Sequence, residues 1–204
     1  MHQLIVVAHP DPRSFTISMG QAYAQTVEGL GQTTDLRDLY QLAFDPCLPA
    51  NELPWSKTFR VGADVVRERA AARRADLIVL VYPLWFNAAP AMLKGYVDRV
   101  FGLGFGFSEQ HQGGNQPLLG DKKLVSFSCS GAPQHWVESS GAWAAMQTHF
   151  DQHLAAVTGM QLIGHHNIGG ILPDLPEEAV DRHLLDVRRH AEAIAQAYSR
   201  TGST

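Results

Sequence analysis

Residues 9–16 combine residue types that can hold a phosphate group. Two prolines keep this segment extended, and Ser14 can cap a helix that follows it. Because a helix start offers N–H groups and positive potential, Ser14 together with Arg13 and Thr16 could form a pyrophosphate cradle. An ordinary capped turn would use the same residues. The segment has no glycine-rich fingerprint, which excludes a Walker loop and a dinucleotide-binding turn of the G-x-G-x-x-G kind.

Residues 83–90 place two adjacent aromatic side chains where a packed loop would ordinarily be polar. Trp85 and Phe86 suit a flat conjugated ligand, although they could instead plug the top of the core. After Pro90 the run AMLKGYVDRVF is amphipathic, and its apolar stripe predicts a helix packed mostly against the core.

Residues 128–136 form a third segment with small and hydroxyl-bearing side chains. Ser128, Cys129, Ser130 and Gly131 let backbone amides approach a ligand closely, and the hydroxyls add donors. If this segment lies beside residues 83–90, the two form the sides of a slot for a flat ring.

The elements that must position these segments alternate between strands and helices. Apolar, β-branched runs predict five strands, at residues 4–8, 33–39, 77–82, 123–128 and 160–168. Apolar side chains at three- and four-residue spacing predict helices at residues 15–30, 60–74, 90–101, roughly 137–158, and 176–198. This alternation predicts an α/β fold with a doubly wound parallel sheet, helices on both faces and strand order 2-1-3-4-5. Ligands of such sheets collect at the carboxyl ends of the strands, which is where the three segments begin.

Length and composition favour one domain, residues 1–204, with 45% hydrophobic residues. A net charge of -4 gives no electrostatic footprint for nucleic acid, so we expect small-molecule or protein partners. Cys47 and Cys129 follow no disulfide or zinc pattern, which fits a reducing compartment. The start of the chain has no basic leader, and no apolar run approaches about 18 residues. We therefore expect a cytoplasmic protein without membrane insertion.

Other clusters have simpler interpretations. His149 and His153 could form a two-ligand metal face, but no third ligand is evident and a solvated helix surface explains them better. His165 and His166 are neighbours in a strand, so they point to opposite faces and are interpreted as structural. The arginine-rich run 67–74 contains Glu68 and follows Asp64, and this mixture of charges predicts a solvated helix face. The glycine-rich stretch 102–106 and the polar run 108–117 predict one surface loop.

With these motifs in place, the chain resembles the flavodoxin-like NAD(P)H:quinone oxidoreductase family. That family includes the mammalian DT-diaphorases and the bacterial ancillary oxidoreductases of glutathione-gated potassium efflux. The most specific element is PLWFNAAPAMLKGYVDRVFGLGFGF at residues 83–107, and AHPDPRSF at residues 8–15 is a second match. The resemblance implies a flavodoxin-like fold, a flavin cofactor (FAD, or alternatively FMN), NAD(P)H as hydride donor, a quinone acceptor and a homodimer that completes the sites.

The resemblance also implies roles for individual residues. The residues implied in flavin binding are His9, Ser14, Phe15, Thr16, Pro83, Leu84, Trp85, Phe86, Asn87, Ser128, Cys129, Ser130 and Gly131. Phe107 and Trp136 would line the acceptor pocket. Catalytic roles are expected for Trp136 and for the amide near Gly131. The family's catalytic histidine aligns with Gly141 or Ala142, so its charge relay is not carried over. His135 could supply a donor instead, or it could simply be exposed to solvent.

The expected reaction is a two-electron transfer in which one cavity serves NAD(P)H first and the quinone afterwards. A reductase of azo dyes, nitroaromatics or free flavin would use the same kind of cavity. A flavin-binding regulatory subunit of a membrane transporter is the alternative from a different class. A one-electron carrier is disfavoured because the chain lacks an acidic docking surface.

Overall fold

The computed structural model describes residues 1–109 and 114–199, and its centre is one parallel five-stranded sheet. The order is β2-β1-β3-β6-β7, which confirms the predicted order because β6 and β7 are the fourth and fifth predicted strands. The strands are β1 (His2–Val7), β2 (Thr33–Asp38), β3 (Leu77–Pro83), β6 (Lys123–Cys129) and β7 (Gln161–Ile168). Strand β3 is buried along its whole length, as expected for an apolar strand covered on both faces.

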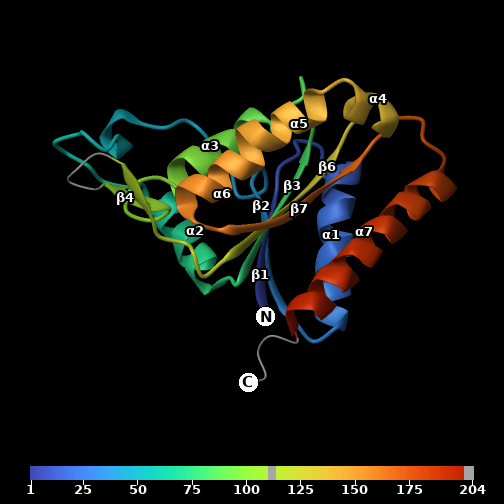
Figure 1. The fold of residues 1–204 in the computed structure, drawn as a ribbon, viewed down its shortest axis with the longest axis horizontal. Helices are drawn as coiled ribbons and strands as arrows, with labels where there is room; N and C mark the ends of the chain where they lie inside the picture. Colours follow the sequence, from blue (N-terminus) through green and yellow to red (C-terminus); the bar gives the residue numbers. More distant parts are fainter. Residues whose placement is uncertain (110–113, 200–204) are drawn as a thin grey trace.

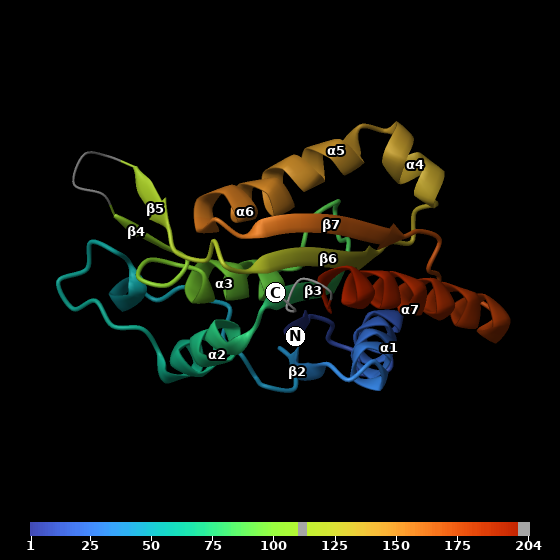
Figure 2. The same ribbon diagram turned by 60° about the horizontal axis from the view of Figure 1, so that its bottom comes forward.

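Helices cover both faces of this sheet. Figure 1 shows α1 and α7 together on one side of the strands and α2, α3 and α6 on the other, and Figure 2 shows the same layers from below. The helices are α1 (Phe15–Gly29), α2 (Ala63–Arg74), α3 (Ala91–Val100), α6 (His153–Thr158) and α7 (Glu177–Ser199). Two apolar clusters result, one around Tyr82 and Tyr96 and the other around Tyr23 and Phe127. In the described part of the chain no helix combines the length and apolar content needed to cross a bilayer.

The single helix predicted for residues 137–158 is wrong. The structure divides this region into α4 (Gln134–Ser139), α5 (Ala142–Met146), a π-helical turn η2 (Gln147–Gln152) and α6. Gly141 separates α4 from α5 with φ of 73°, a left-handed conformation that glycine adopts without steric cost. The turn η2 then shifts the register of the winding, so that Asp151 is fully buried.

The surface loop predicted between α3 and β6 is also partly structured. Residues Phe107–Glu109 (β4) and Asn115–Pro117 (β5) pair as a short antiparallel hairpin, and the tip of the predicted polar run, residues 110–113, lies outside the described residues. A short 3-10 helix, η1 (Ala50–Glu52), lies in the connection between β2 and α2.

The solvated face predicted for residues 67–74 is wrong at two positions. Glu68 is buried and accepts from Arg37, while Arg69 is buried and its Nε donates to the carbonyl of Val100 at 2.9 Å. Arg69 thereby satisfies a carbonyl at the end of α3 that has no partner within that helix. These two side chains fix α2 against the sheet and α3.

The two neighbouring histidines of β7 lie on opposite faces of the sheet, as predicted. His165 contacts Asp151 of η2, whereas the His166 ring lies 4.0 Å from that of His190 on α7 and 5.0 Å from that of Phe127. Burial, followed by repulsion from His190 and His165, lowers the pKa of His166 from 6.5 to about 4.

The lowered pKa of His166 predicts that acid destabilises the folded state. The unfolded chain binds the His166 proton near pH 6.5 and the folded chain only near pH 4, so stability is present at neutral pH and falls as the pH drops through that window. Allowing for partial exposure, the loss is about 2 kcal/mol. Urea unfolding at about pH 7 and pH 4.5 should show that His166→Gln reduces this loss, whereas His149→Gln, at an exposed position, should leave it unchanged. Equal losses in all three proteins would contradict the assignment.

Candidate functional site

The three segments that follow β1, β3 and β6 meet around one cavity of about 630 Å³. This position, at the carboxyl ends of the strands beside the switch point, is the predicted one. The predicted site residues that line the cavity are His9, Ser14, Phe15, Thr16, Pro83, Leu84, Trp85, Cys129, Ser130 and Gly131.

The first wall is the start of α1. Ser14 is its N-cap, and its hydroxyl accepts the N–H of Ile17 at 3.3 Å. Within the described chain, no hydrogen bond uses the N–H groups of Phe15 and Thr16, so they remain as donors at the positive end of a 15-residue helix. Arg13, with 90% of its side chain exposed, adds a positive charge at the same place, although its Nε lies 3.6 Å from the carboxylate of Asp11, which also lines the cavity.

The second wall is a tight turn after β3. Trp85 and Ala88 exchange two backbone hydrogen bonds of 3.1 Å, while Phe86 and Asn87 have φ of 50° and 56°. Two successive left-handed residues make this a type I′ turn, a conformation that a bulky residue such as Phe86 adopts at a steric cost. The Asn87 side chain donates to the carbonyl of Ala142 at 2.8 Å and so ties the turn to α5. Such strain is typical of functional segments.

The third wall is the segment after β6. Ser130 N–H donates to the carbonyl of Ile168 at 3.0 Å, and its hydroxyl donates to that of Ala132 at 3.0 Å. The Ser130 amide is therefore committed to the fold, which corrects, for Ser130, the expectation that the backbone amides of residues 128–131 approach a ligand. Among the described residues, no acceptor takes the N–H of Gly131.

Cys129 lies at the base of the cavity as a protonated thiol. Burial raises the pKa of Cys129 to about 11, although a contact of 3.4 Å between its sulfur and the Thr16 hydroxyl partly offsets this. Cys129 therefore contributes a small apolar surface and a link to α1 rather than a nucleophile.

Sequence reasoning missed the fourth wall, which comes from the β7–α7 connection and the first turn of α7. Its residues are mainly apolar: Ile171, Leu172, Pro173, Leu175 and Val180. The N–H of Ile171 donates to the carbonyl of Ser130 at 2.9 Å, which joins this wall to the third. The available signal was the run ILPDLP at residues 171–176, which begins two glycines after the fifth predicted strand.

Several predicted site residues do not reach the cavity. Ser128 is fully buried beneath the sheet edge, where its hydroxyl donates to Asn167 at 2.8 Å. The residues that lie outside the cavity on exposed or half-buried surface are Phe86, Asn87, Phe107, His135 and Trp136.

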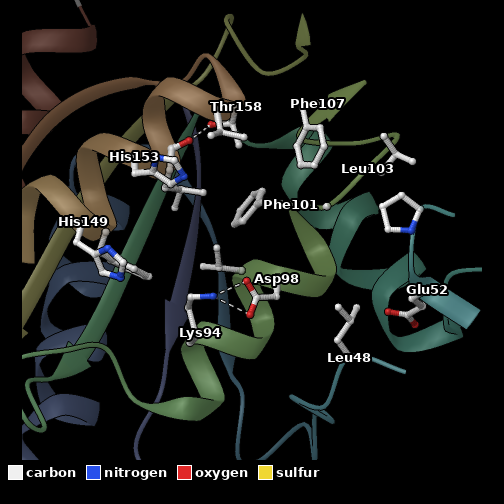
Figure 3. A pocket seen from close by; sticks show the side chains of 16 residues that line it. Leu48, Glu52, Lys94, Asp98, Phe101, Leu103, Phe107, His149, His153 and Thr158 are labelled. Atoms are coloured by element: carbon white, nitrogen blue, oxygen red, sulfur yellow. Dashed lines mark hydrogen bonds and ion pairs between the residues drawn. The ribbon is translucent and has the colours of Figure 1, made fainter. Parts of the chain in front are cut away.

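Phe107 instead borders a separate groove of about 350 Å³ between α3, α6 and the η1 region. Figure 3 shows Phe101 near the middle of this groove, with Phe107 above it, His149 and His153 along one side and the Lys94–Asp98 ion pair below. Over residues 1–109 and 114–199 no cluster of three or more metal-ligating side chains forms, so the two histidines have no third ligand there.

Comparison with known proteins agrees with this architecture. Residues 1–191 match the model of a protein family described as having a flavodoxin-like fold. The chain belongs to this flavodoxin-like family. All residues that line the cavity at the switch point lie within the matched residues 1–191.

Individual relatives share only part of their length with this flavodoxin-like chain. It is 38% identical over 137 residues to an uncharacterized NAD(P)H oxidoreductase of Haemophilus influenzae, a match that covers 65% of each chain. It is 28% identical over 153 residues to ribosyldihydronicotinamide dehydrogenase [quinone] of Rattus norvegicus, covering 67% of this chain and 66% of that one. The match therefore spans just under two thirds of these curated relatives.

Solved structures match over nearly the whole flavodoxin-like chain. The NAD(P)H:quinone oxidoreductase from Methanothermobacter marburgensis has a TM-score of 0.83 at 25% identity and covers 95% of this chain and 96% of its own. An FMN-dependent NADH-azoreductase from Bacillus anthracis, solved with FMN, shares the fold with a TM-score of 0.72 at 19% identity, covering 95% of this chain and 99% of its own.

Proposed function

We propose that this chain is a flavin-dependent NAD(P)H oxidoreductase that reduces quinones or similar flat acceptors. The observation that carries the proposal is the cavity at the switch point. It joins a helix start with unused N–H groups to walls with exposed aromatic and small residues. The names of the relatives, NAD(P)H oxidoreductase and quinone dehydrogenase, support the same class of reaction.

The residues of the cavity fit both the phosphate and the conjugated ring system of a flavin. The N–H groups of Phe15 and Thr16, together with Arg13, suit phosphate, since an anion at a helix start is stabilised by the helix dipole. Trp85 and Leu84 supply the apolar surface that a conjugated ring system needs, and Gly131 supplies a backbone donor beside it.

FAD is the flavin that we propose, with FMN as the alternative. The mainly apolar wall formed by Ile171, Leu172 and Val180 suits an aromatic base rather than a phosphate, and FMN has no such base. When bound, the flavin would supply the redox chemistry by accepting hydride from NAD(P)H and passing it to the acceptor. The chain itself would bind and orient the ring, and the fixed N–H of Gly131 would stabilise negative charge that develops beside it.

The acceptor side requires a second copy of the chain in this proposal. Trp136 is 57% exposed and Phe107 borders the groove of Figure 3, so within one chain neither lines the cavity. We propose a homodimer in which these aromatics and the His135 donor complete the acceptor pocket. Sedimentation equilibrium should give twice the chain mass, and a monomer with full activity would refute the dimer.

The absorbance spectrum of the purified protein tests the central proposal. We expect the bands of oxidised flavin, release of FAD on denaturation, and bleaching on addition of NADH or NADPH without air. Parallel lines should appear when NAD(P)H and quinone are varied together, since one cavity serves both. A colourless protein that takes up neither FAD nor FMN would overturn the proposed function.

A further inference from the structure

A series of hydrogen-bonded polar side chains leads from the protein interior to the cavity. Only its last member, Ser130, lines a cavity wall. Ser128 Oγ lies 2.8 Å from His165 Nε2, and His165 Nδ1 lies 2.6 Å from Asp151 Oδ2. The His165 side chain is 1% exposed and that of Asp151 is 0% exposed. These are the three groups of a nucleophilic serine site, but Ser128 is fully buried and donates its proton to Asn167 at 2.8 Å. This hydrogen-bonded series therefore does not serve nucleophilic catalysis and must have another role.

The series of hydrogen bonds continues from Ser128 to the cavity wall. The Asn167 amide nitrogen donates to Gln134 Oε1 at 2.7 Å and to the Ser130 hydroxyl at 3.4 Å. Ser130 in turn donates to the carbonyl of Ala132. The turn that carries Gly131 is thus held from beneath by Asn167.

The direction of every bond is fixed from the outer end. The carboxylate of Glu138 accepts only, so Gln134 turns its nitrogen toward Glu138, at 2.8 Å, and its oxygen toward Asn167. Asn167 must then present nitrogen to Gln134 and oxygen to Ser128. As a result, the Ser128 proton points to Asn167, and its lone pairs face His165.

This direction sets the protonation of the buried pair. His165 Nε2 must carry a proton to donate to Ser128, while Nδ1 faces the carboxylate of Asp151. Asp151 also accepts from the Ser126 hydroxyl at 2.7 Å, through its other oxygen. One proton therefore lies between Nδ1 and Oδ2, and the pair is electrically neutral as a whole.

We propose that the Asp151–His165 pair is a positioning device for the cavity. It anchors the inner end of the series whose direction Glu138 sets at the outer end: His165 Nε2–H donates to Ser128, Ser128 donates to Asn167, and Asn167 donates to Ser130, which holds the Gly131 amide toward the ligand. His165 and Asp151 are positioning residues, since neither lines the cavity. The effect on ligand binding rests on the proposed flavin function, whereas the protonation and the turn geometry do not.

Three features around the Asp151–His165 pair support its role in positioning. Asp151 reaches His165 from the π-helical turn η2, a rare conformation that is frequent at functional sites. The Trp143 ring lies edge-on to His165 at 4.7 Å. The Tyr82 hydroxyl is buried without a hydrogen-bond partner among the described residues, and burial followed by the charge of Asp151 raises the pKa of Tyr82 well above its usual range. The other buried side chains named above each have a hydrogen-bond partner, and a buried network of this kind makes its neighbours rigid.

Two matched variants separate positioning from general packing. Ser126 and Ser128 are both fully buried on β6, both face the pair, and each loses one hydroxyl on change to alanine. Only Ser128 connects the pair to Asn167. Titration with FAD and with FMN should show that Ser128→Ala weakens binding about tenfold, while Ser126→Ala changes it less than about twofold.

The protonation state gives a readout that needs no flavin. Nitrogen NMR of the chain without flavin should show His165 Nε2 protonated and a strongly deshielded proton on Nδ1. Asp151→Asn should remove that deshielded proton yet keep FAD affinity, because the new amide can donate to Nδ1 while Nε2–H still reaches Ser128. The Gly131 amide resonance should move in Ser128→Ala and stay in Ser126→Ala.

The outcomes distinguish the two proposals. An unprotonated Nε2, or equal displacement of the Gly131 resonance in both alanine variants, would overturn the positioning role whatever the flavin result. Failure of the unmodified chain to bind FAD or FMN would overturn the proposed function alone, because the resonances report on the chain without a ligand.

Discussion

Replacement of Gly131 by leucine is expected to weaken FAD binding by about 100-fold or more, equivalent to about 2.7 kcal/mol, while the fold stays intact. A Cβ at this position would lie 3.7 Å from the carbonyl of Ile171 and 3.7 Å from a methyl of Leu172, which are ordinary contacts. Gly131 has no positive φ, so leucine can adopt its backbone conformation. Because Gly131, Ile171 and Leu172 all line the cavity, the longer side chain would occupy ligand space.

Fluorescence titration with FAD measures this effect, and thermal unfolding measures the stability. Gly29→Leu is the matched control, since a Cβ at Gly29 meets no atom within 4 Å and the position is exposed at the end of α1. The control should bind FAD normally. If Gly131→Leu also bound FAD normally, the flavin would have to lie elsewhere.

The position of this cavity could be predicted because it depends on strand order, and strand order depends on uniformly apolar segments. Strands β1 and β3 are buried along their apolar runs, and the chain enters the three walls directly from β1, β3 and β6. Ser14 acts as the predicted helix cap for the same local reason: a hydroxyl before a helix accepts a free N–H.

Contacts between distant segments could not be predicted in this way. Ser128 belongs to a segment that suits a ligand, yet strand alternation turns its side chain away from the cavity toward His165. The burial of Asp151 depends on η2, since a regular helix through residues 147–152 would place the carboxylate at a different angle. The apolar fourth wall has no motif of its own and is identified only when the β7–α7 connection folds over the third wall.

Arg99→Met is expected to destabilise the fold by about 3–4 kcal/mol, because it leaves two carboxylates without their cation. Arg99 binds Glu52 through two hydrogen bonds of 2.9 and 2.7 Å and Asp64 through bonds of 2.7 and 3.2 Å. The side chains of Arg99 and Glu52 are only 4% and 3% exposed. Burial alone would raise the pKa of Glu52, but the bonds from Arg99 and from the Gly62 N–H lower it below its usual value. With methionine in place of Arg99, the bonds that lower the pKa of Glu52 would be lost, and burial would raise that pKa.

Lys94→Met on the same helix is the control. Lys94 pairs with Asp98 at 2.6 Å, but these side chains are 52% and 43% exposed, so its loss should cost less than about 0.5 kcal/mol. Urea unfolding of both variants makes the comparison, and equal losses would show that the Arg99 cluster is no stronger than a surface pair. Adding Glu52→Gln to Arg99→Met should recover part of the loss, since it removes one unpaired charge.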